Sequence, residues 1–153
     1  MSIEQRIRDL GIDLPPATAP WANYANAVRT GDLLFISGKG PTPVNERPPK
    51  GRLGAEFSVE DGYRLARSAG LDLLAVIRTE LGSLDRVAKV VEIQGFVNAT
   101  PEFEEHPQVL DGCSDLLVEV FGDRGIHARS VFGATSLRAG FPVILKGVVE
   151  VAA

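Results

Sequence analysis

The strand-forming segments of this chain are apolar on both sides, while only two long segments have the periodicity of helices. LLFIS, starting at Leu33, and PVILKGVVEV, starting at Pro142, lack the strict alternation of a strand with one solvated face. Two helices cover only one face of a single sheet, because right-handed crossovers place both on the same side. The other face must then be buried against something else, and association with further copies of the chain is the simplest answer.

Sequence signals at the ends of these segments place the elements in chain order. We expect a short helix over Ser2–Leu10, a hairpin of Asn26–Arg29 with Leu33–Ser37, a helix from the capping box Ser58–Asp61 to Gly82, a strand over Arg86–Asn98, a helix from near Pro107 to Gly122, and strands over Ala128–Leu137 and Pro142–Val151. This β-β-α-β-α-β-β order predicts an α+β fold in one domain over 1–153, in which 1–19 form an N-terminal helix and a proline-rich lead-in. The long loop Lys39–Phe57, with four prolines, is expected to be mobile or functional.

Composition narrows the range of partners. The 153 residues include 16 Lys and Arg against 20 Asp and Glu, and this net charge of −4 argues against nonspecific binding of nucleic acid. One cysteine excludes an internal disulfide and a multi-cysteine zinc site, and we expect neither a metal nor a cofactor. No apolar run approaches the roughly 20 residues of a membrane span, and the charged N-terminus lacks the apolar core of a signal peptide. We therefore expect a soluble, cytoplasmic protein without a membrane partner.

Few residues stand out as candidates for chemistry. Cys113 is expected in the core of the second long helix, and His106, in a charged segment before that helix, has no partner at metal-ligand spacing. Lys39, in the sequence Gly-Lys-Gly, resembles only a fragment of a phosphate loop. Arg129 begins an otherwise small and apolar strand, which leaves two interpretations open. It is either a salt-bridge partner at the edge of the sheet or a guanidinium that holds a substrate carboxylate in a cleft between subunits.

Three stretches of the sequence together resemble one family. Tyr24–Gly38 reads YANAVRTGDLLFISG, Gly82–Val87 reads GSLDRV, and Ala128–Ser130 reads ARS. In this order and spacing they resemble the Rid family (YjgF-like, reactive intermediate deaminases), over most of the chain from Pro20 onward. The resemblance implies a chorismate-mutase-like fold with one mixed sheet and two major helices on one face. It also implies a homotrimer whose sheets surround a central barrel, with clefts between subunits.

The resemblance further implies an activity, the hydrolysis of enamine or imine intermediates to 2-keto acids and ammonia, without a cofactor. Arg129 matches the arginine that grips the carboxylate of a small metabolite, and Tyr24 matches the cleft tyrosine. Gly38 matches a strand-end glycine whose backbone faces the ligand, and Val131 stands where many members use only the backbone of a cysteine. An imine carbon is already electrophilic, so holding it beside a water in a dry cleft supplies much of the catalysis.

Two positions depart from the pattern of deaminating members. Gly112 falls where those members carry an asparagine, and Lys146 falls where they carry a water-orienting glutamate. Glu150, in the last strand, is close enough to serve as that glutamate after a small shift in alignment. Lys146 near Arg129 would also favour a doubly anionic ligand.

These departures leave three interpretations of the function. The protein is an imine or enamine deaminase that uses Arg129 and Glu150, or a metabolite-binding trimer that keeps the carboxylate clamp without hydrolysis. The third interpretation is RNA cleavage, because the chain resembles a divergent branch often labelled as endoribonucleases. For that reaction it offers only His106 and His127 as histidine acid–base groups, and nucleic acid is not the expected partner.

Overall fold

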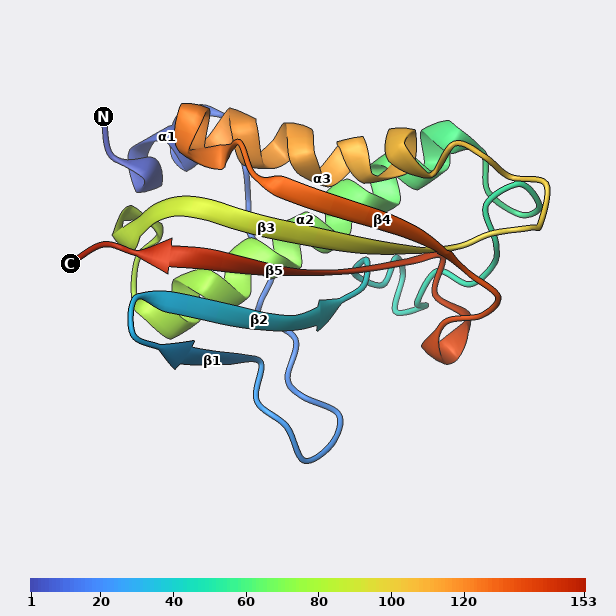
Figure 1. Ribbon diagram of the computed structural model, residues 1–153, viewed down its shortest axis with the longest axis horizontal. Helices are drawn as coiled ribbons and strands as arrows, with labels where there is room; N and C mark the ends of the chain where they lie inside the picture. The colour runs from blue at the N-terminus through green and yellow to red at the C-terminus, as the bar shows by residue number, and fades with distance from the viewer.

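A computed structural model describes all 153 residues and contains one five-stranded sheet. The strands are β1 (Ala27–Thr30), β2 (Leu33–Lys39), β3 (Val87–Asn98), β4 (Ala128–Ala134) and β5 (Val143–Val151). Their order across the sheet is β1-β2-β5-β3-β4. Strands β3 and β4 are parallel, and the remaining neighbouring pairs, β1–β2, β2–β5 and β5–β3, are antiparallel. The expected α+β fold with a single mixed sheet is therefore confirmed (Figure 1).

Two long helices lie behind this sheet, as Figure 1 shows. The helices of the chain are α1 (Ile3–Asp9), α2 (Val59–Leu81) and α3 (His106–Phe121). The predicted capping box is present, since Ser58 and Asp61 each accept a backbone N–H of the other at the start of α2. Gly82 ends that helix in the left-handed region, with a φ of 84°. None of the helices combines the length and the apolar character that a membrane crossing requires.

The end of the chain differs from the sequence expectation in the length of one strand. β4 stops at Ala134, three residues before the predicted end, and a 3-10 turn at Arg138–Gly140 follows it. β5 then pairs with β2 and β3 in the middle of the sheet, so β4 is left at the edge. This crossover carries the turn Arg138–Gly140 to the end of the sheet where β2 finishes.

The face of the sheet that meets α2 and α3 is closed by large aliphatic side chains. The fully buried ones include Leu73, Leu74, Ile77, Ile93, Leu110, Leu116, Leu117 and Leu145. The two helices approach so closely at Gly112 that a Cβ there would lie 1.9 Å from the carbonyl oxygen of Tyr63. No side chain fits this contact, so Gly112 sets the distance between the helices.

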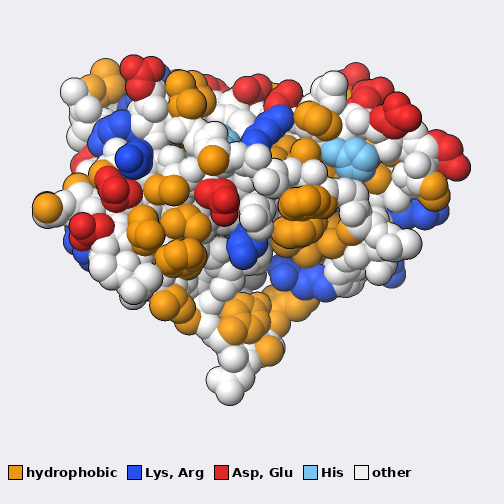
Figure 2. Space-filling model, viewed as in Figure 1, with side chains coloured by type: hydrophobic (Ala, Val, Ile, Leu, Met, Phe, Trp, Pro, Cys, Tyr) orange, Lys and Arg blue, Asp and Glu red, His pale blue; other side chains and the backbone are white.

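The opposite face of the sheet carries apolar side chains that nothing in the chain covers. Val28, Phe35 and Phe132 are 58%, 45% and 49% exposed, and Phe96 stacks on Phe132 with ring centroids 5.7 Å apart. Figure 2 shows hydrophobic side chains gathered over the strands on this face, with charged groups between them. The sequence expectation that one face of the sheet lacks a helical cover is confirmed.

The long loop after β2 is tied to the far end of the sheet. Leu53 is fully buried, its N–H donates to the carbonyl of Asn98, and its carbonyl accepts from Thr100. The N–H of Gly51 donates to the carbonyl of Gly140 at 3.0 Å. The loop therefore holds the turn Arg138–Gly140 in place beside the end of β2.

Candidate functional site

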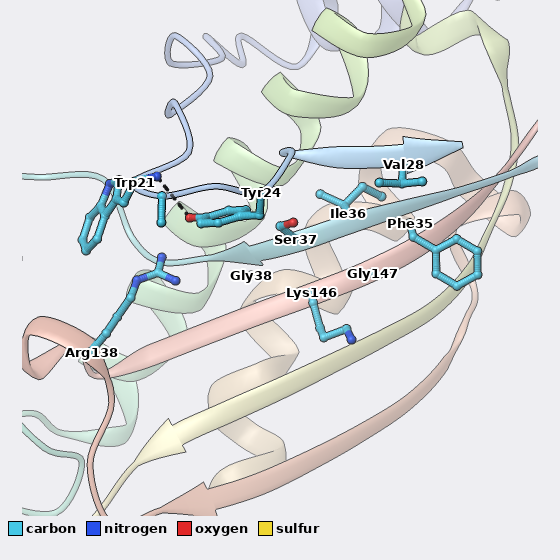
Figure 3. A pocket seen from close by; sticks show the side chains of 11 residues that line it. Trp21, Tyr24, Val28, Phe35, Ile36, Ser37, Gly38, Arg138, Lys146 and Gly147 are labelled. Atoms are coloured by element: carbon cyan, nitrogen blue, oxygen red, sulfur yellow. Dashed lines mark hydrogen bonds between the residues drawn. The ribbon is translucent and has the colours of Figure 1, made fainter. Parts of the chain in front are cut away.

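A cavity of about 600 Å³ opens on the uncovered face, between the lead-in segment, β2, β5 and the turn Arg138–Gly140 (Figure 3). It is lined by Trp21, Ala22, Tyr24, Val28, Phe35, Ile36, Ser37, Gly38, Arg138, Lys146 and Gly147. Three residues singled out in the sequence, Tyr24, Gly38 and Lys146, thus line one pocket, which we call the outer pocket. Arg138 and Trp21 were not singled out, because neither belongs to a recognisable motif.

The aromatic end of the outer pocket is built by hydrogen bonds between the lead-in segment and β2. The N–H of Ser37 donates to the carbonyl of Asn26, and its hydroxyl donates to the carbonyl of Ala25 at 2.7 Å. These bonds continue the β1–β2 hairpin past the start of β1 and bring Tyr24 next to the strand. The hydroxyl of Tyr24 accepts the backbone N–H of Trp21 at 3.3 Å, which ties the Tyr24 side chain to the lead-in segment.

Arg138 reaches this end of the pocket from the other side. Its turn is tight, because Ala139 and Gly140 both have positive φ, of 52° and 71°. The guanidinium carbon lies 4.8 Å from the ring centroid of Trp21 and 5.5 Å from that of Phe141. These cation–π contacts hold the guanidinium without neutralising its charge. Figure 3 shows Arg138 extending toward Tyr24, with Lys146 further along the pocket.

The charge of the outer pocket is positive. Lys146 and Arg138 line it, and no aspartate or glutamate does. Neither side chain takes part in any of the ion pairs within the chain. A planar guanidinium that is free of a carboxylate partner can bind the two oxygens of a ligand carboxylate side by side.

A second, inner cavity of about 200 Å³ adjoins the outer pocket and shares Trp21, Tyr24, Gly38 and Arg138 with it. Its wall includes two buried charged residues, Lys39 at 4% exposure and Asp72 at 2%. The Lys39 ammonium donates to the Asn26 side-chain oxygen at 2.6 Å. Burial lowers the pKa of Lys39, and the charge of Asp72 opposes this shift.

Arg129, the arginine picked out by the sequence, lies elsewhere. It is on the helix-covered side of β4, because it pairs across the strands with the buried Ile93. Its guanidinium donates to the carboxylate of Asp111 at 2.8 Å and to the hydroxyl of Ser114 at 3.1 Å, both on α3. The single chain therefore shows the salt bridge, one of the two interpretations left open. Within one chain Arg129 and Lys146 point to opposite faces of the sheet, so they do not jointly bind an anion there.

The remaining predicted site residues do not line the outer pocket. Gly112 is buried at the contact of α2 with α3, and Val131 is half-buried against the core of the covered face. Glu150 lies on β5 four residues beyond Lys146, which at about 3.3 Å per residue separates the two by roughly 13 Å. In this chain Glu150 is therefore too far from Lys146 to orient a water at that pocket.

His106 and Cys113 are on α3, and His127, just before β4, bonds to Ser114 of the same helix. Ser114 and the Nε2 of His127 are 2.9 Å apart, while Nδ1 of His127 is 2.6 Å from the Gly125 carbonyl and must carry the proton. His106 begins α3 and packs against Phe103, about 12 Å along the helix from Ser114 at 1.5 Å per residue. The histidines therefore do not form one acid–base pair in this chain. Cys113 is fully buried, which raises its pKa to about 12.

Comparisons with known proteins agree with this fold over nearly the whole chain. The family model described as "YjgF/chorismate mutase-like, putative endoribonuclease" matches residues 4–142. Protein TCP17 of Trypanosoma cruzi is 38% identical over 149 residues, 97% of this chain and 93% of that protein. The crystal structure of Atu1372 from Agrobacterium tumefaciens, a protein of unknown function, is 34% identical with a TM-score of 0.89, covering 97% of this chain and 92% of that one. A "putative endoribonuclease" from Shewanella oneidensis is 31% identical with a TM-score of 0.93, covering 98% and 99%. The chain belongs to the YjgF/chorismate mutase-like family.

Proposed function

We propose that this protein binds a small carboxylate-bearing metabolite in the outer pocket, with Arg138 and Lys146 holding the carboxylate. The observation that carries this proposal is the charge of the pocket wall, which contains two cations and no acid. Tyr24 offers a hydroxyl, and Trp21 offers an apolar surface for the carbon chain of the ligand. A carboxylate bound here exchanges its hydration for bonds to cations that have no other anionic partner.

We propose further that the protein acts as a homotrimer. Support comes from the exposed Val28, Phe35 and Phe132 on the uncovered face of the sheet, since large apolar patches are the usual mark of an interface. A second copy would close the outer pocket, which is open to solvent in the single chain. The free edge of β4, with Arg129 near its start, is available to form that second wall, as the resemblance to the Rid family implies.

Imine hydrolysis is the second candidate function, on the same site. Tyr24 and Gly38 match the family pattern and do line the pocket. The outer wall has no carboxylate to orient water, which favours binding over hydrolysis as the first proposal. RNA cleavage has less support, because the outer pocket holds no histidine and the two histidines are apart.

Calorimetry with 2-oxobutanoate, a small carboxylate, tests the binding proposal. We expect Arg138→Gln to weaken binding about tenfold or more, and Lys146→Gln to weaken it less, because a lysine makes no bidentate contact. Lys89→Gln is the matched control, since Lys89 is an exposed lysine of β3 outside the pocket. Equal affinities in all four proteins, or no binding by the wild type, would contradict the proposal.

Two further measurements test the homotrimer and imine hydrolysis separately. Light scattering at micromolar concentration is expected to give the mass of three chains, and a stable single chain would contradict the trimer. The decay of 2-iminobutyrate, generated in place by an amino-acid dehydratase, tests hydrolysis. Acceleration that Arg138→Gln abolishes supports the deaminase, whereas binding without acceleration leaves a metabolite-binding protein.

A further inference from the structure

We propose that Lys39 is a nucleophile that forms a Schiff base with the carbonyl group of a 2-oxo acid whose carboxylate is held by Arg138. This inference rests on the proposed binding site and names the class of ligand that the site takes. It assigns the inner cavity as the place where the carbonyl carbon lies. It also gives the protein a route to imine chemistry without a water-orienting glutamate.

The position of the inner cavity is the first support. It lies between the lead-in segment, the loop after β2 and helix α2, and both Arg138 and Lys39 line it. Its volume of about 200 Å³ equals roughly seven water molecules at about 30 Å³ each, which suits a short oxo acid. Because four residues are shared with the outer pocket, a ligand anchored at Arg138 reaches Lys39 without a change of fold.

The state of the amine is the second support. The Lys39 side chain is buried, and the only hydrogen bond of its amine is to Asn26 at 2.6 Å. The amide of Asn26 is itself fixed, because its Nδ2 donates to the carbonyl of Thr18 at 2.7 Å. Burial lowers the pKa of Lys39 most, and the charge of Arg138 lowers it further, against Asp72 and Tyr24. Burial is the main effect, and it favours the neutral, nucleophilic form of the amine.

Asp72 supplies the third support, a carboxylate in the wall of the same cavity that can relay a proton through a water. It lies on α2, is 2% exposed and lines the inner cavity together with Lys39. Its Oδ1 accepts the N–H of Thr18 at 3.2 Å, which fixes the carboxylate. A buried carboxylate that only balanced the charge of Lys39 would be expected in an ion pair with it, yet no such pair forms within 4.0 Å.

The covalent step balances without any co-reactant. The lone pair of the neutral Lys39 amine adds to the carbonyl carbon, and the electron pair of the C=O bond moves to oxygen. The two protons of the amine pass in turn to this oxygen, which leaves as water when the C=N bond forms. Asp72 relays them through one intervening water, because its carboxylate lies more than 4.0 Å from the amine. With a 2-imino acid the same addition expels ammonia instead. Water then hydrolyses the Schiff base to the 2-oxo acid and the free amine.

Reductive trapping tests this inference on the whole protein. The protein is incubated with 2-oxobutanoate and borohydride, and the adduct is located by peptide mapping. We expect one reduced adduct per chain, on Lys39. Lys39→Arg keeps the charge and should lower trapping at least tenfold, whereas Lys50→Arg, at an exposed lysine of the same loop, should leave it unchanged within twofold. If Lys39→Arg does not fold, the peptide map of the wild type decides the question, because it reports each lysine separately.

The outcomes separate this inference from the proposed function. If 2-oxobutanoate binds with dependence on Arg138 but Lys39 is not modified, the inference is wrong and the binding function stands. If the adducts are spread over exposed lysines at equal yield, the inference is also overturned. If neither binding nor trapping occurs, both proposals are wrong. Both proposals are supported if Lys39 is modified and if fumarate, a carboxylate without a keto group, protects it from modification.

Discussion

Arg129 and Arg138 lie on consecutive stretches of the chain but in opposite electrostatic situations. Arg129 has a carboxylate of the same chain at 2.8 Å, from Asp111 on α3. Arg138 has the rings of Trp21 and Phe141 beside it and no acid. Both guanidinium groups are charged at every physiological pH, so charge alone does not distinguish them. What distinguishes them is whether the fold already supplies the anion.

The surroundings of the two arginines extend this contrast. On the α3 side, the Ser114 hydroxyl donates to Nε2 of His127 and accepts from Arg129, and these bonds form a closed set. On the pocket side, Lys146 has no ionic partner, and Lys39 is buried with one hydrogen bond. Arg138 and Lys146 are exposed and form no ion pair within the chain, so an external anion meets no internal competitor there. This difference is why we propose a ligand site on the pocket side and a structural role for Arg129 on the α3 side.

The largest expected effect tests the structural role of the α3 side. In Gly112→Ala the new methyl group would lie 1.9 Å from the carbonyl oxygen of Tyr63, so α2 and α3 must separate. We expect the free energy of unfolding to fall by about 3 kcal/mol, the upper part of the range for overpacked cores. Urea denaturation of the variant and the wild type measures this loss.

A matched control for this prediction lies on the same helix. Val118 is 40% exposed, so Val118→Ala should change the free energy of unfolding by about 0.5 kcal/mol. If Gly112→Ala were as stable as Val118→Ala but bound 2-oxobutanoate less well, the α3 side would not have the purely structural role that we expect. Gly112 would then act in a ligand site, as the resemblance implies.

The next effect compares the two arginines directly in ligand binding. Arg138→Gln should weaken the binding of 2-oxobutanoate about tenfold or more, the loss of one charge-assisted contact. Arg129→Gln should weaken it threefold at most, because Asp111 competes for that guanidinium. Calorimetry on both variants at the same ionic strength gives the two ratios. A larger loss in Arg129→Gln would reverse the assignment and place the carboxylate at the β4 edge.

Local sequence signals predicted the elements well and the site only partly. The capping box at Ser58, the left-handed stop at Gly82 and the hairpin around Gly31 depend on residues close in sequence, and all three are confirmed. Tyr24 and Gly38, which were singled out through the resemblance, do line the pocket. These features share short-range causes, which one sequence can show.

The rest of the site depends on contacts between distant segments. Arg138 reaches the pocket because β5 crosses to the middle of the sheet and because the loop bonds to Gly140 from Gly51. Asp111 neutralises Arg129 from another element, so no spacing around Arg129 shows it. The sequence shows Lys39 only as part of a weak phosphate-loop fragment, and the fold is needed to show that it is buried in the cavity wall that also contains Asp72. Packing between distant segments determines the surroundings of these three side chains, and the periodicity of the sequence does not show such packing.

A smaller effect is expected for the Arg129–Asp111 pair itself. Their side chains are 27% and 45% exposed, so solvent screens much of the attraction. A double-mutant cycle with Arg129→Gln and Asp111→Asn should give a coupling of roughly 0.5–1 kcal/mol in unfolding, and less at about 1 M salt. Zero coupling at low salt would mean that Arg129 is not engaged by Asp111 in solution, and it would make that guanidinium available for a ligand.

The smallest effect concerns the acid stability of the α3 side. Burial lowers the pKa of His127 from its ordinary value of 6.5, and the charge of Arg129 adds to the shift, against the hydrogen bond to Gly125. The fold therefore favours the neutral imidazole, which accepts the Ser114 hydroxyl. Below pH 6.5 the unfolded chain takes up a proton that the folded chain does not. The contribution of His127 to stability is thus complete above pH 6.5 and is lost as the pH falls through the lower, folded value.

His127→Gln should flatten this dependence, because glutamine keeps a hydrogen-bonding group and does not titrate. Urea denaturation at about pH 7.5 and about pH 5 is expected to show a smaller loss of stability in the variant than in the wild type. His106→Gln is the control, since His106 lies at the other end of α3 and outside the hydrogen bonds of Arg129. Two results would contradict this prediction: an unchanged pH dependence of stability in His127→Gln, or a flattened pH dependence in His106→Gln. Either would show that the closed set of hydrogen bonds around Arg129 does not control acid stability. The contrast between the two arginines would then rest on the Asp111 salt bridge alone.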